Sequence, residues 1–583
     1  MFSLKRDQLL LSLRPASEFC PVPPISDRRA WDSVERPLIG ELIARADAAA
    51  RRENPRLDAL AMLENRSEEY ERAYFERRDQ LRTLLCGACL AGEARYLMPI
   101  AQRAFSICEE SGWTLKGDGR LHESDRPQID LHAAQTAELM ALTLYLMRRS
   151  LDSLSPEIAR RIRRELTFRV IRPLCAEDRG ALIFPLRDTP SATAALMCAA
   201  LLTETDGQAR WLCMRRMLSL IEDYMLTLSP DGGFLTGGLE AHMRATAALG
   251  DCLRMISLSS GGEVELRDEP LFIDMALIPS ALHVGEGWFF NPGGDSPRPR
   301  VPVDELFRLG DGVRSGELCQ LAAYLNRPGN SGGRAVGYGA LCTLLNILYR
   351  ADLAREPARA ALREGVCLRG MQLLAIRMGA FYAALSGGAN TDRADHLDVG
   401  DMAIYYNGKP VVIDPGMESA AEYHSVPSVG GVKQDYTLSP PRDEVDCRLD
   451  EGYFLISLGI AHAYPEAARL ENWQRSLMMS AFEPGVRLME VFDFAPGVKS
   501  EVSFHFVTPY AARLSAGEAA LGPVKLSWPD EALSAAVEPL PLKSGDQRLL
   551  LGDKVYRLTL TTRQKVPGGN YTFIFRPAGP DGK

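Results

Sequence analysis

The chain has 583 residues, which is too many for one hydrophobic core, since domains usually hold roughly 100 to 200 residues. Its hydrophobic content of 46% and charged content of 25% are near globular averages, which argues against a disordered chain and against a membrane protein. The formal net charge of −9 excludes a whole-molecule attraction for nucleic acid. An acidic polymer would therefore need a local basic groove.

The N-terminal segment carries no evident targeting signal. Its apolar stretch, residues 9–13, is broken at once by Arg14 and Pro15, and no apolar run in the chain approaches the about 20 residues that span a bilayer. The 12 cysteines are scattered without metal-binding pairs, which favours buried free thiols in a reducing compartment. We therefore expect a cytoplasmic protein that does not bind a membrane.

Residues 38 to 352 have the periodicity of helices separated by short turns. The stretch 129–151 is apolar on nearly all sides, as is typical of a helix packed between other helices, and His132 within it is expected to be a core residue bonded to the backbone. The next helix should begin at Ser155, as the cap, with Pro156 in the first turn. Successive helical hairpins of this kind predict a toroid or an irregular bundle.

After about residue 366 the pattern changes to short runs with alternating apolar residues, such as 502–507, 556–560 and 571–575. Turn signals such as Pro415-Gly416 separate them. This pattern predicts an antiparallel β-sandwich. The expected fold class is α+β with several domains: an α-helical toroid over residues 1–360, followed by an antiparallel β-sandwich over residues 361–583.

Four candidate metal ligands, His396, Asp398, Asp414 and His424, lie within 29 positions of the second half. Imidazole nitrogens and carboxylate oxygens together suit zinc, and three such ligands leave a fourth position open for water or substrate. The alternative is that both histidines are bonded to backbone carbonyls at an edge of the sandwich.

The order of these residues resembles that of heparinase II/III-like polysaccharide lyases. The resemblance covers about residues 110 to 500, and its segments are Asp231-Gly232-Gly233, Phe289-Phe290-Asn291, His396-Leu397-Asp398, Ile413-Asp414-Pro415-Gly416, Tyr423-His424-Ser425 and Trp473-Gln474-Arg475. It implies a helical toroid followed by a β-sandwich, and an acidic oligosaccharide or polysaccharide as partner.

The resemblance also implies a cofactor. Some lyases of this family hold a zinc ion at places that match His396, Asp414 and His424, and Asp398 would then orient His396. No organic cofactor is implied, and homodimer formation stays open.

The implied reaction is β-elimination at a uronic acid unit of a glycosaminoglycan or an alginate-like polymer. This chemistry needs a group that neutralises the C5 carboxylate, a base for the C5 proton and an acid for the departing O4. In the family, Asn or His serves the first role, and Tyr and His serve the others.

The chain departs from the family at these catalytic positions. The stretch Asp188–Thr193 stands where an Asn-Trp-Asn-like stretch is usual, Glu240 replaces the expected Tyr, and Ala394 replaces a His. Glu240 and His242, just after Gly237-Gly238, would then supply acid and base with different chemistry. The alternative is an ordinary first helical turn, in which Glu240 favours the helix dipole.

Four further residues complete the predicted site. Tyr423, adjacent to His424, is the tyrosine expected to supply the acid, although packing in the sandwich would also explain it. Ser191, Asn390 and Gln434 are the expected substrate-binding residues.

Three functions are compatible with this sequence. The first is a lyase acting on uronate-containing oligosaccharides. The second is a glycoside hydrolase that pairs Glu240 with Asp231 or Asp295 across about 5 to 10 Å. The third is a glycan-binding protein that kept the lyase scaffold and lost its catalytic groups.

Overall fold

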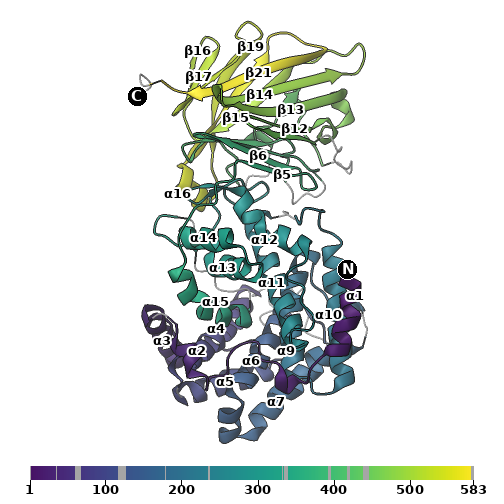
Figure 1. Ribbon diagram of the computed structural model, residues 1–583, viewed down its shortest axis with the longest axis vertical. Coiled ribbons are helices and arrows are strands. Elements are labelled where there is room, and N and C mark those ends of the chain that lie inside the picture. The colour runs from purple at the N-terminus through teal and green to yellow at the C-terminus, as the bar shows by residue number, and fades with distance from the viewer. Residues whose placement is uncertain are drawn as a thin grey trace.

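The computed structural model of the chain places a helical N-terminal part and a β-sheet C-terminal part end to end along the longest axis (Figure 1). The structure describes residues 2–34, 36–58, 67–92, 94–115, 127–176, 179–233, 237–330, 332–333, 339–390, 396–416, 421–436 and 445–579. Ala394 lies outside these residues.

The helical part contains α1 (Phe2–Ser12), α2 (Arg28–Asp32), α3 (Arg36–Arg51), α4 (Ser67–Ala91), α5 (Leu97–Cys108), α6 (Leu131–Leu154), α7 (Pro156–Leu166), α8 (Arg172–Cys175), α9 (Thr189–Thr203), α10 (Gly207–Met225), α11 (Gly238–Ser259), α12 (Pro270–Leu282), α13 (Val303–Gly312), α14 (Gly316–Leu325) and α15 (Ala340–Arg355). Short strands β1 (His283–Gly285), β2 (Trp288–Phe289), β3 (Val301–Pro302) and β4 (Gly332–Gly333) lie between them.

The helices form a closed array because neighbours in sequence pack in pairs and the last helix returns to an early one. α3 packs on α4, α6 on α7, α9 on α10 and α13 on α14, and α15 packs on both α13 and α6. The predicted start of α7 is confirmed, because the Ser155 hydroxyl accepts a hydrogen bond from the Glu157 amide. At the start of α6, the structure shows that Asp130 accepts a hydrogen bond from the Ala133 amide. The predicted helical toroid is the architecture of this part.

The contact between α6 and α15 depends on a buried carboxyl. Glu138 of α6 accepts a hydrogen bond of 2.5 Å from the Ala340 amide, at the N-terminus of α15. Burial raises the pKa of Glu138 to about 7, although backbone amides of α15 oppose the shift. The folded protein therefore favours the neutral form of an acid whose ordinary pKa is 4.5.

We expect Glu138→Gln to raise the Tm above pH 7 and to have little effect near pH 4.5. The folded-state pKa lies above the unfolded one, so the wild type loses stability as pH rises from 4.5 to about 7, by roughly 3 kcal/mol at about 1.4 kcal/mol per unit. The Tm of the wild type and of the variant, measured from roughly pH 4 to 8, spans the unfolded and the folded pKa of Glu138 and tests this expectation. Glu263→Gln, at an exposed position, is the control. A Tm difference independent of pH would contradict the assignment.

The C-terminal part contains β5 (Gly365–Leu368), β6 (Leu373–Met378), β7 (Phe381–Ser386), β8 (Met402–Tyr406), β9 (Lys409–Val412), β10 (Ser428–Val429), β11 (Val445–Asp450), β12 (Tyr453–Gly459), β13 (Leu470–Ser480), β14 (Glu483–Phe494), β15 (Val502–Thr508), β16 (Arg513–Ser515), β17 (Glu518–Leu521), β18 (Val524–Ser527), β19 (Leu533–Pro541), β20 (Lys554–Thr562) and β21 (Gly568–Pro577). One short helix, α16 (Gly545–Leu551), connects β19 to β20.

Within the described residues these strands form three antiparallel sheets. Their orders are β5-β6-β7-β8-β9, β10-β15-β20-β19 and β11-β12-β13-β14-β21-β18-β17-β16. Apolar residues of all three meet in one core, with the eight-stranded sheet packed over β6 and β7. The predicted α+β organisation, with a helical toroid followed by an antiparallel β-sandwich, is confirmed.

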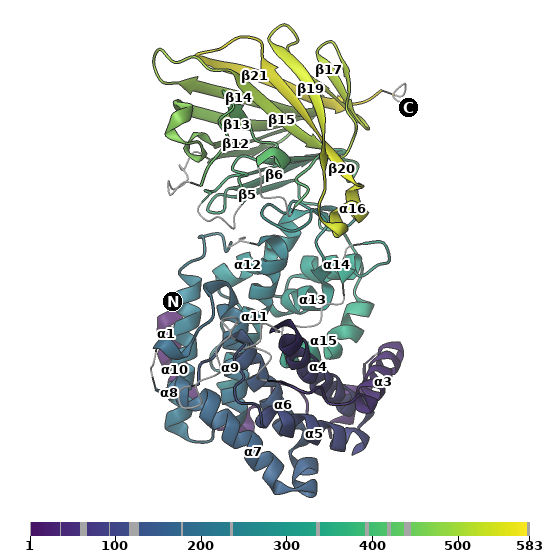
Figure 2. The ribbon, with the colours of Figure 1, turned by 180° about the vertical axis from the view of Figure 1, so that it is seen from behind.

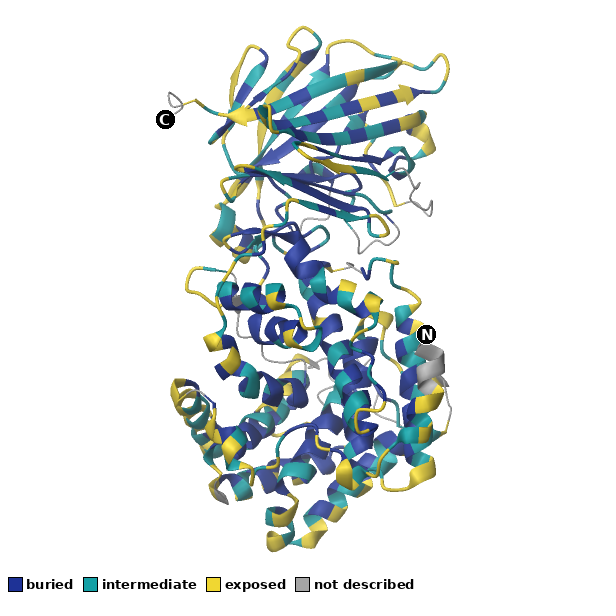
Figure 3. Cartoon of the chain, viewed as in Figure 1, coloured by how far each residue is buried: buried dark blue, intermediate teal, exposed yellow. Residues whose placement is uncertain are grey.

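The five-stranded sheet is covered on both faces. In β7, Phe381 and Leu385 point into the sandwich core, whereas Tyr382 and Ala384 pack against α12, α13 and α14. The eight-stranded sheet differs, because its strands alternate between buried and exposed residues, as the coloured bands in Figure 3 show. The five-stranded sheet therefore joins the two parts through an apolar contact.

α16 is the element of the sandwich that reaches toward the helical part. Seen from both sides, it lies below the sheets and beside the helices (Figures 1 and 2). Across the described residues, no helix has the length and apolar character needed to cross a bilayer.

Candidate functional site

A cavity of about 1030 Å³ lies where the helical part faces α16. Its walls come from the N-terminal ends of α6, α9 and α11, from the segment 295–302, and from Asp546, Leu549 and Leu550 of α16. This volume is at the upper end of the roughly 300 to 1,000 Å³ usual for ligand sites, and is large enough for an oligosaccharide segment. The cavity is the candidate substrate cleft.

Glu240 lies in the cavity wall, in the first turn of α11. Its carboxylate accepts a hydrogen bond of 3.4 Å from the Asn291 side-chain amide. Burial raises the pKa of Glu240, hydrogen bonds from its own amide and from Asn291 oppose the shift, and the charge of Asp295 adds to it. A carboxyl whose pKa is raised in this way holds a proton more readily than an ordinary glutamate, which suits proton transfer.

The glycines before Glu240 serve the fold of α11. Gly237 and Gly238 have φ of 88° and 71°, a left-handed conformation that favours glycine. A Cβ on Gly238 would lie 2.3 Å from the Gly294 Cα, and the Asn291 side chain accepts a hydrogen bond from the Leu239 amide at 2.7 Å. The glycines thus allow this turn to pack closely against the protein backbone at Gly294, and not against a ligand. The packed turn places Glu240 in the cavity wall.

Two arginines, Arg187 and Arg244, line the same cavity and are exposed. Arg244 follows Glu240 by one helical turn, and Arg187 belongs to a 3₁₀ turn, Leu186–Asp188, that packs against α11. Neither guanidinium has a hydrogen bond or an ion pair within the part of the chain that the structure describes. Both can therefore bind an anionic ligand without breaking a protein contact.

His132 also lines the cavity, so the expectation that it is a core residue is wrong. It is half-buried, and its Nδ1 accepts or donates no hydrogen bond among the described residues. Its ring lies edge-on to Phe75, 5.1 Å between centroids, and both residues line a second cavity of about 300 Å³. Because His132 and Gln135 border both cavities, the two cavities lie next to each other along α6.

A buried side-chain amide of α16, that of Gln547, bonds to the sandwich. Gln547 donates hydrogen bonds to the carbonyls of Pro415, at 2.8 Å, and of Gly416. Gly416 in turn lies against Asp295, because a Cβ on it would come within 2.5 Å of the Asp295 carbonyl oxygen. The turn after Asp414 therefore contacts two walls of the cavity, the segment at Asp295 and α16.

The four candidate metal ligands are brought together. His396, Asp398, Asp414 and His424 each offer a ligand atom, and these atoms all lie within 4.8 Å of one another. The rings of His396 and His424 have centroids 5.2 Å apart. None of these four residues is among those that line the cavity. The cluster is connected to the cavity through the turn at Pro415 and Gly416, which contacts the cavity walls.

Asp401 is a member of this cluster that the sequence did not reveal. His424 Nδ1 lies 3.0 Å from its carboxylate and 3.7 Å from that of Asp414. Burial would lower the pKa of His424, but the charges of Asp414 and Asp401 raise it to about 10. Burial raises the pKa of Asp414, with a further contribution from Asp401. The histidine is thus oriented by a carboxylate, as is usual for metal-bound imidazoles.

The donor set fits a divalent metal ion. One carboxylate oxygen of Asp414, Oδ2, is buried and accepts no hydrogen bond among the described residues, which leaves it available as a ligand. Two imidazoles with one or two carboxylates match the ligands of protein metal sites. His396, Asp414 and His424 could therefore hold such an ion.

A buried arginine, Arg475, connects the two segments that carry the candidate ligands. Arg475 pairs with Glu490 at 2.6 Å, and both side chains are fully buried. Its other nitrogen donates to the carbonyls of Gly400 and Ser425, both at 2.6 Å. It thereby ties together the two segments that carry the ligands.

The other predicted site residues are placed as follows. Ser191 lines the cavity at the start of α9. His242 and Tyr423 do not line it: both are buried, with His242 bonded to the Met275 carbonyl at 2.9 Å and the Tyr423 hydroxyl donating to the Pro541 carbonyl at 2.8 Å. Their polar groups are thus engaged by the backbone.

Asn390 and Gln434 lie together inside the sandwich. The Asn390 amide donates to the Gln434 side chain at 3.0 Å, and Gln434 holds both the amide and the carbonyl of Val399. Both residues are buried outside the cavity lining, so their contacts support the segment that carries His396 and Asp398.

Asp231 lies at the joint between the two parts of the chain. Its carboxylate accepts hydrogen bonds from the amides of Gly370, at 2.7 Å, and Met371, at 3.3 Å. The cavity lining includes Asp295 and does not include Asp231. Of the two carboxylates considered as partners of Glu240, Asp295 is therefore the one that shares its cavity.

We expect Asp231→Asn to lower the stability by about 1.5 to 3 kcal/mol, the range for hydrogen bonds to a charged group, and to leave turnover nearly unchanged. Thermal unfolding and initial rates measure the two effects, with the exposed Asp223→Asn as control. Loss of turnover without a change in Tm would instead place Asp231 in the reaction.

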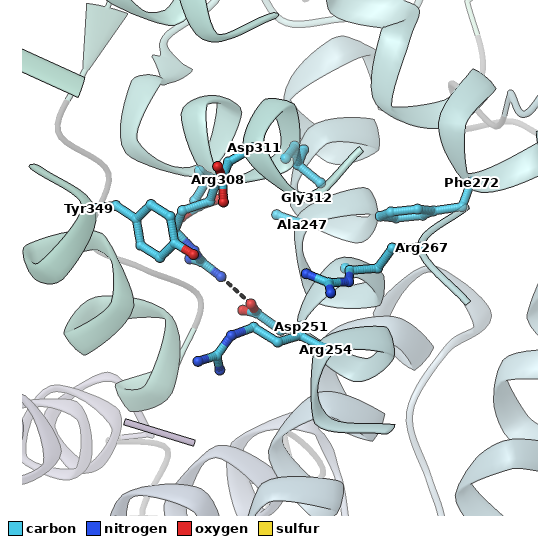
Figure 4. A pocket seen from close by; sticks show the side chains of 12 residues that line it. Ala247, Asp251, Arg254, Arg267, Phe272, Arg308, Asp311, Gly312 and Tyr349 are labelled. Carbon is cyan, nitrogen blue, oxygen red and sulfur yellow. Dashed lines mark hydrogen bonds and ion pairs between the residues drawn. The ribbon is translucent and has the colours of Figure 1, made fainter. Parts of the chain in front are cut away.

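A smaller polar pocket, of about 40 Å³, lies between α11, α13 and α15 (Figure 4). Its three guanidiniums are already engaged: Arg308 pairs with Asp251, Arg267 pairs with Glu265 at 2.7 Å, and Arg254 donates to a backbone carbonyl near the N-terminus. This pocket is well below the size of a ligand site, and its Arg308–Asp251 ion pair joins α13 to α11.

The chain has the fold of polysaccharide lyases built from a helical toroid and a β-sandwich, and the predicted resemblance is confirmed at the level of the fold. A heparinase III structure superimposes with a TM-score of 0.61 at 12% identity, covering 92% of this chain and 84% of that chain. No protein-family model and no curated protein matches the sequence.

Two further lyases show the same likeness. Heparan sulfate lyase HepC from Pedobacter heparinus has a TM-score of 0.58 at 10% identity, covering 99% of this chain and 87% of its own. The chondroitin AC lyase of Streptomyces coelicolor A3, in complex with chondroitin sulphate, has a TM-score of 0.55 at 13% identity. This match covers 100% of this chain and 83% of that chain.

Proposed function

We propose that the protein is a lyase that cleaves acidic oligosaccharides by β-elimination at a uronic acid unit. The observation that carries the proposal is the cavity between the toroid and α16, which combines a carboxyl of raised pKa, Glu240, with two arginines that have no described partner. The arginines suit an acidic sugar and the carboxyl suits proton transfer.

Glu240 would carry the proton in this reaction. Its carboxylate removes the C5 proton, the electron pair forms the C4=C5 double bond, and the C4–O4 bond breaks. The protonated carboxyl then gives its proton to the departing O4, so one group serves as base and acid. Because His242 and Tyr423 are bonded to backbone carbonyls outside the cavity, the proposal assigns them positioning roles.

We also propose zinc as the ion for His396, Asp414 and His424. When bound, it would supply charge that fixes the ligand-bearing loops. The residues of the chain then do the rest: the turn at Pro415 and Gly416 positions Asp295 and α16, and Asp401 orients His424.

The test is incubation with a panel of uronate oligosaccharides, followed by ultraviolet absorbance of the unsaturated product. Absorbance that grows with time and enzyme concentration is expected for at least one oligosaccharide. Absence of any absorbance across the panel, from protein with intact thermal unfolding, would reject the lyase.

One observation favours a second function, a glycoside hydrolase. Glu240 and Asp295 line the same cavity, and the charge of Asp295 contributes to the raised pKa of Glu240, as in enzymes with paired carboxyls. Release of new reducing ends without an unsaturated product would select this function.

A further inference from the structure

We propose that Arg244, together with Arg187, binds the carboxylate of the sugar in the cleft and neutralises it during the reaction. This inference rests on the proposed function and identifies the group that performs a role for which the chain has no evident asparagine. It also predicts the substrate class, which is a sugar with a free carboxylate.

The reaction itself requires such a group. Removing the C5 proton builds negative charge next to a carboxylate that is already charged, and the barrier is prohibitive unless a cation or strong donors face that carboxylate. A guanidinium can do both, because it is always charged and its parallel N–H groups match the two carboxylate oxygens.

The position of Arg244 fits this task. It follows Glu240 by four residues on α11, so both side chains lie on one face of the helix, and both line the cavity. A sugar whose C5 proton faces Glu240 would carry its carboxylate on the neighbouring carbon, within reach of a long side chain one turn away. Arg187 joins from the adjacent 3₁₀ turn, which packs against α11.

The other arginines of the cavity are less available. Arg298 donates to the carbonyls of Glu286, at 3.0 Å, and Gly329, and lies over the Trp288 ring. Arg300 pairs with Asp546 of α16 at 3.8 Å. Arg187 and Arg244 are thus the lining guanidiniums whose donors have no partner among the described residues.

The experiment compares a uronate oligosaccharide with its methyl ester, in which the charge is already removed. We expect Arg244→Gln to lower kcat/KM for the free acid by about 100-fold, the cost of losing one charge-stabilising donor, and to leave the ester within a few-fold. Arg187→Gln should show the same selectivity with a smaller loss, and Arg244→Lys should recover part of the rate on the acid because it keeps the charge. Arg160→Gln, an exposed arginine of α7, is the matched control.

Equal losses on acid and ester in both variants would overturn the inference, because a merely structural arginine would affect both substrates alike. If the wild type forms unsaturated product from neither substrate, the proposed function fails and binding becomes the readout. Calorimetry should then show that Arg244→Gln weakens the affinity for the free acid at least tenfold more than the affinity for the ester. If the wild type binds the acid and the ester with equal affinity, that result alone would overturn the inference.

Discussion

Glu240→Gln is expected to lower the rate of product formation by about 10²- to 10⁴-fold, the usual contribution of a general acid or base. The amide keeps the shape and the contact with Asn291 but cannot take a proton. The base works when ionised, and its pKa is raised above the ordinary 4.5, so kcat/KM of the wild type should rise with pH through a limb that lies above pH 4.5.

Initial rates and thermal unfolding measured on the same preparations check this prediction. Glu157→Gln is the matched control, because Glu157 also stands in the first turn of a helix and is exposed outside the cavity. Full turnover by Glu240→Gln would exclude Glu240 from proton transfer, under both the lyase and the hydrolase.

Zinc added to chelator-treated protein is expected to raise the Tm, and the shift should disappear in His396→Ala and in His424→Ala. A ligand that binds only the folded state stabilises it by about 2.7 kcal/mol at 100 times its Kd. The ligand atoms converge within 4.8 Å, so loss of one imidazole removes a large part of the site.

Scanning calorimetry with and without zinc, together with direct titration, measures this effect independently of activity. His462→Ala is the control, because that ring is bonded to the Gly388 carbonyl outside the cluster and the zinc-dependent shift should remain. An equal shift in the wild type and in both cluster variants would show that zinc binds elsewhere.

A bound ion would also affect the cleft. The turn at Pro415 and Gly416 follows the ligand Asp414 directly, and it contacts both Asp295 and Gln547 of α16. An ion held by Asp414 would therefore restrain two walls of the cavity through a few residues. By this route a site outside the cavity would support the proposed reaction inside it.

Local sequence signals predicted most of the secondary structure. The capping residue Ser155 marks the start of α7, and the alternating runs became β15, β20 and β21. The four metal-ligand candidates were also found, because two His and two Asp lie within 29 positions in a segment whose order resembles that of a known family. These features depend on neighbouring residues, which a sequence shows directly.

Burial was harder to predict where two layers meet. Tyr405 and Tyr406 alternate as in any strand, yet both are packed, Tyr405 against the helices and Tyr406 against the sandwich core. His132 shows the opposite case: an apolar helix suggested the core, but the closed array leaves this residue at the cavity. In both cases, whether the side chain is buried depends on which other element packs against its side of the strand or helix.

By itself the sequence determined the order of the two parts, the start of α7 at Ser155, the period of the strands and the four candidate metal ligands. Only the tertiary structure decided that α16 closes the cleft, that Asp401 completes the cluster, and that Arg187 and Arg244 share a cavity with Glu240. The physical reason is distance along the chain: a cavity is built from segments hundreds of residues apart, and no local propensity or spacing records which of them will face each other.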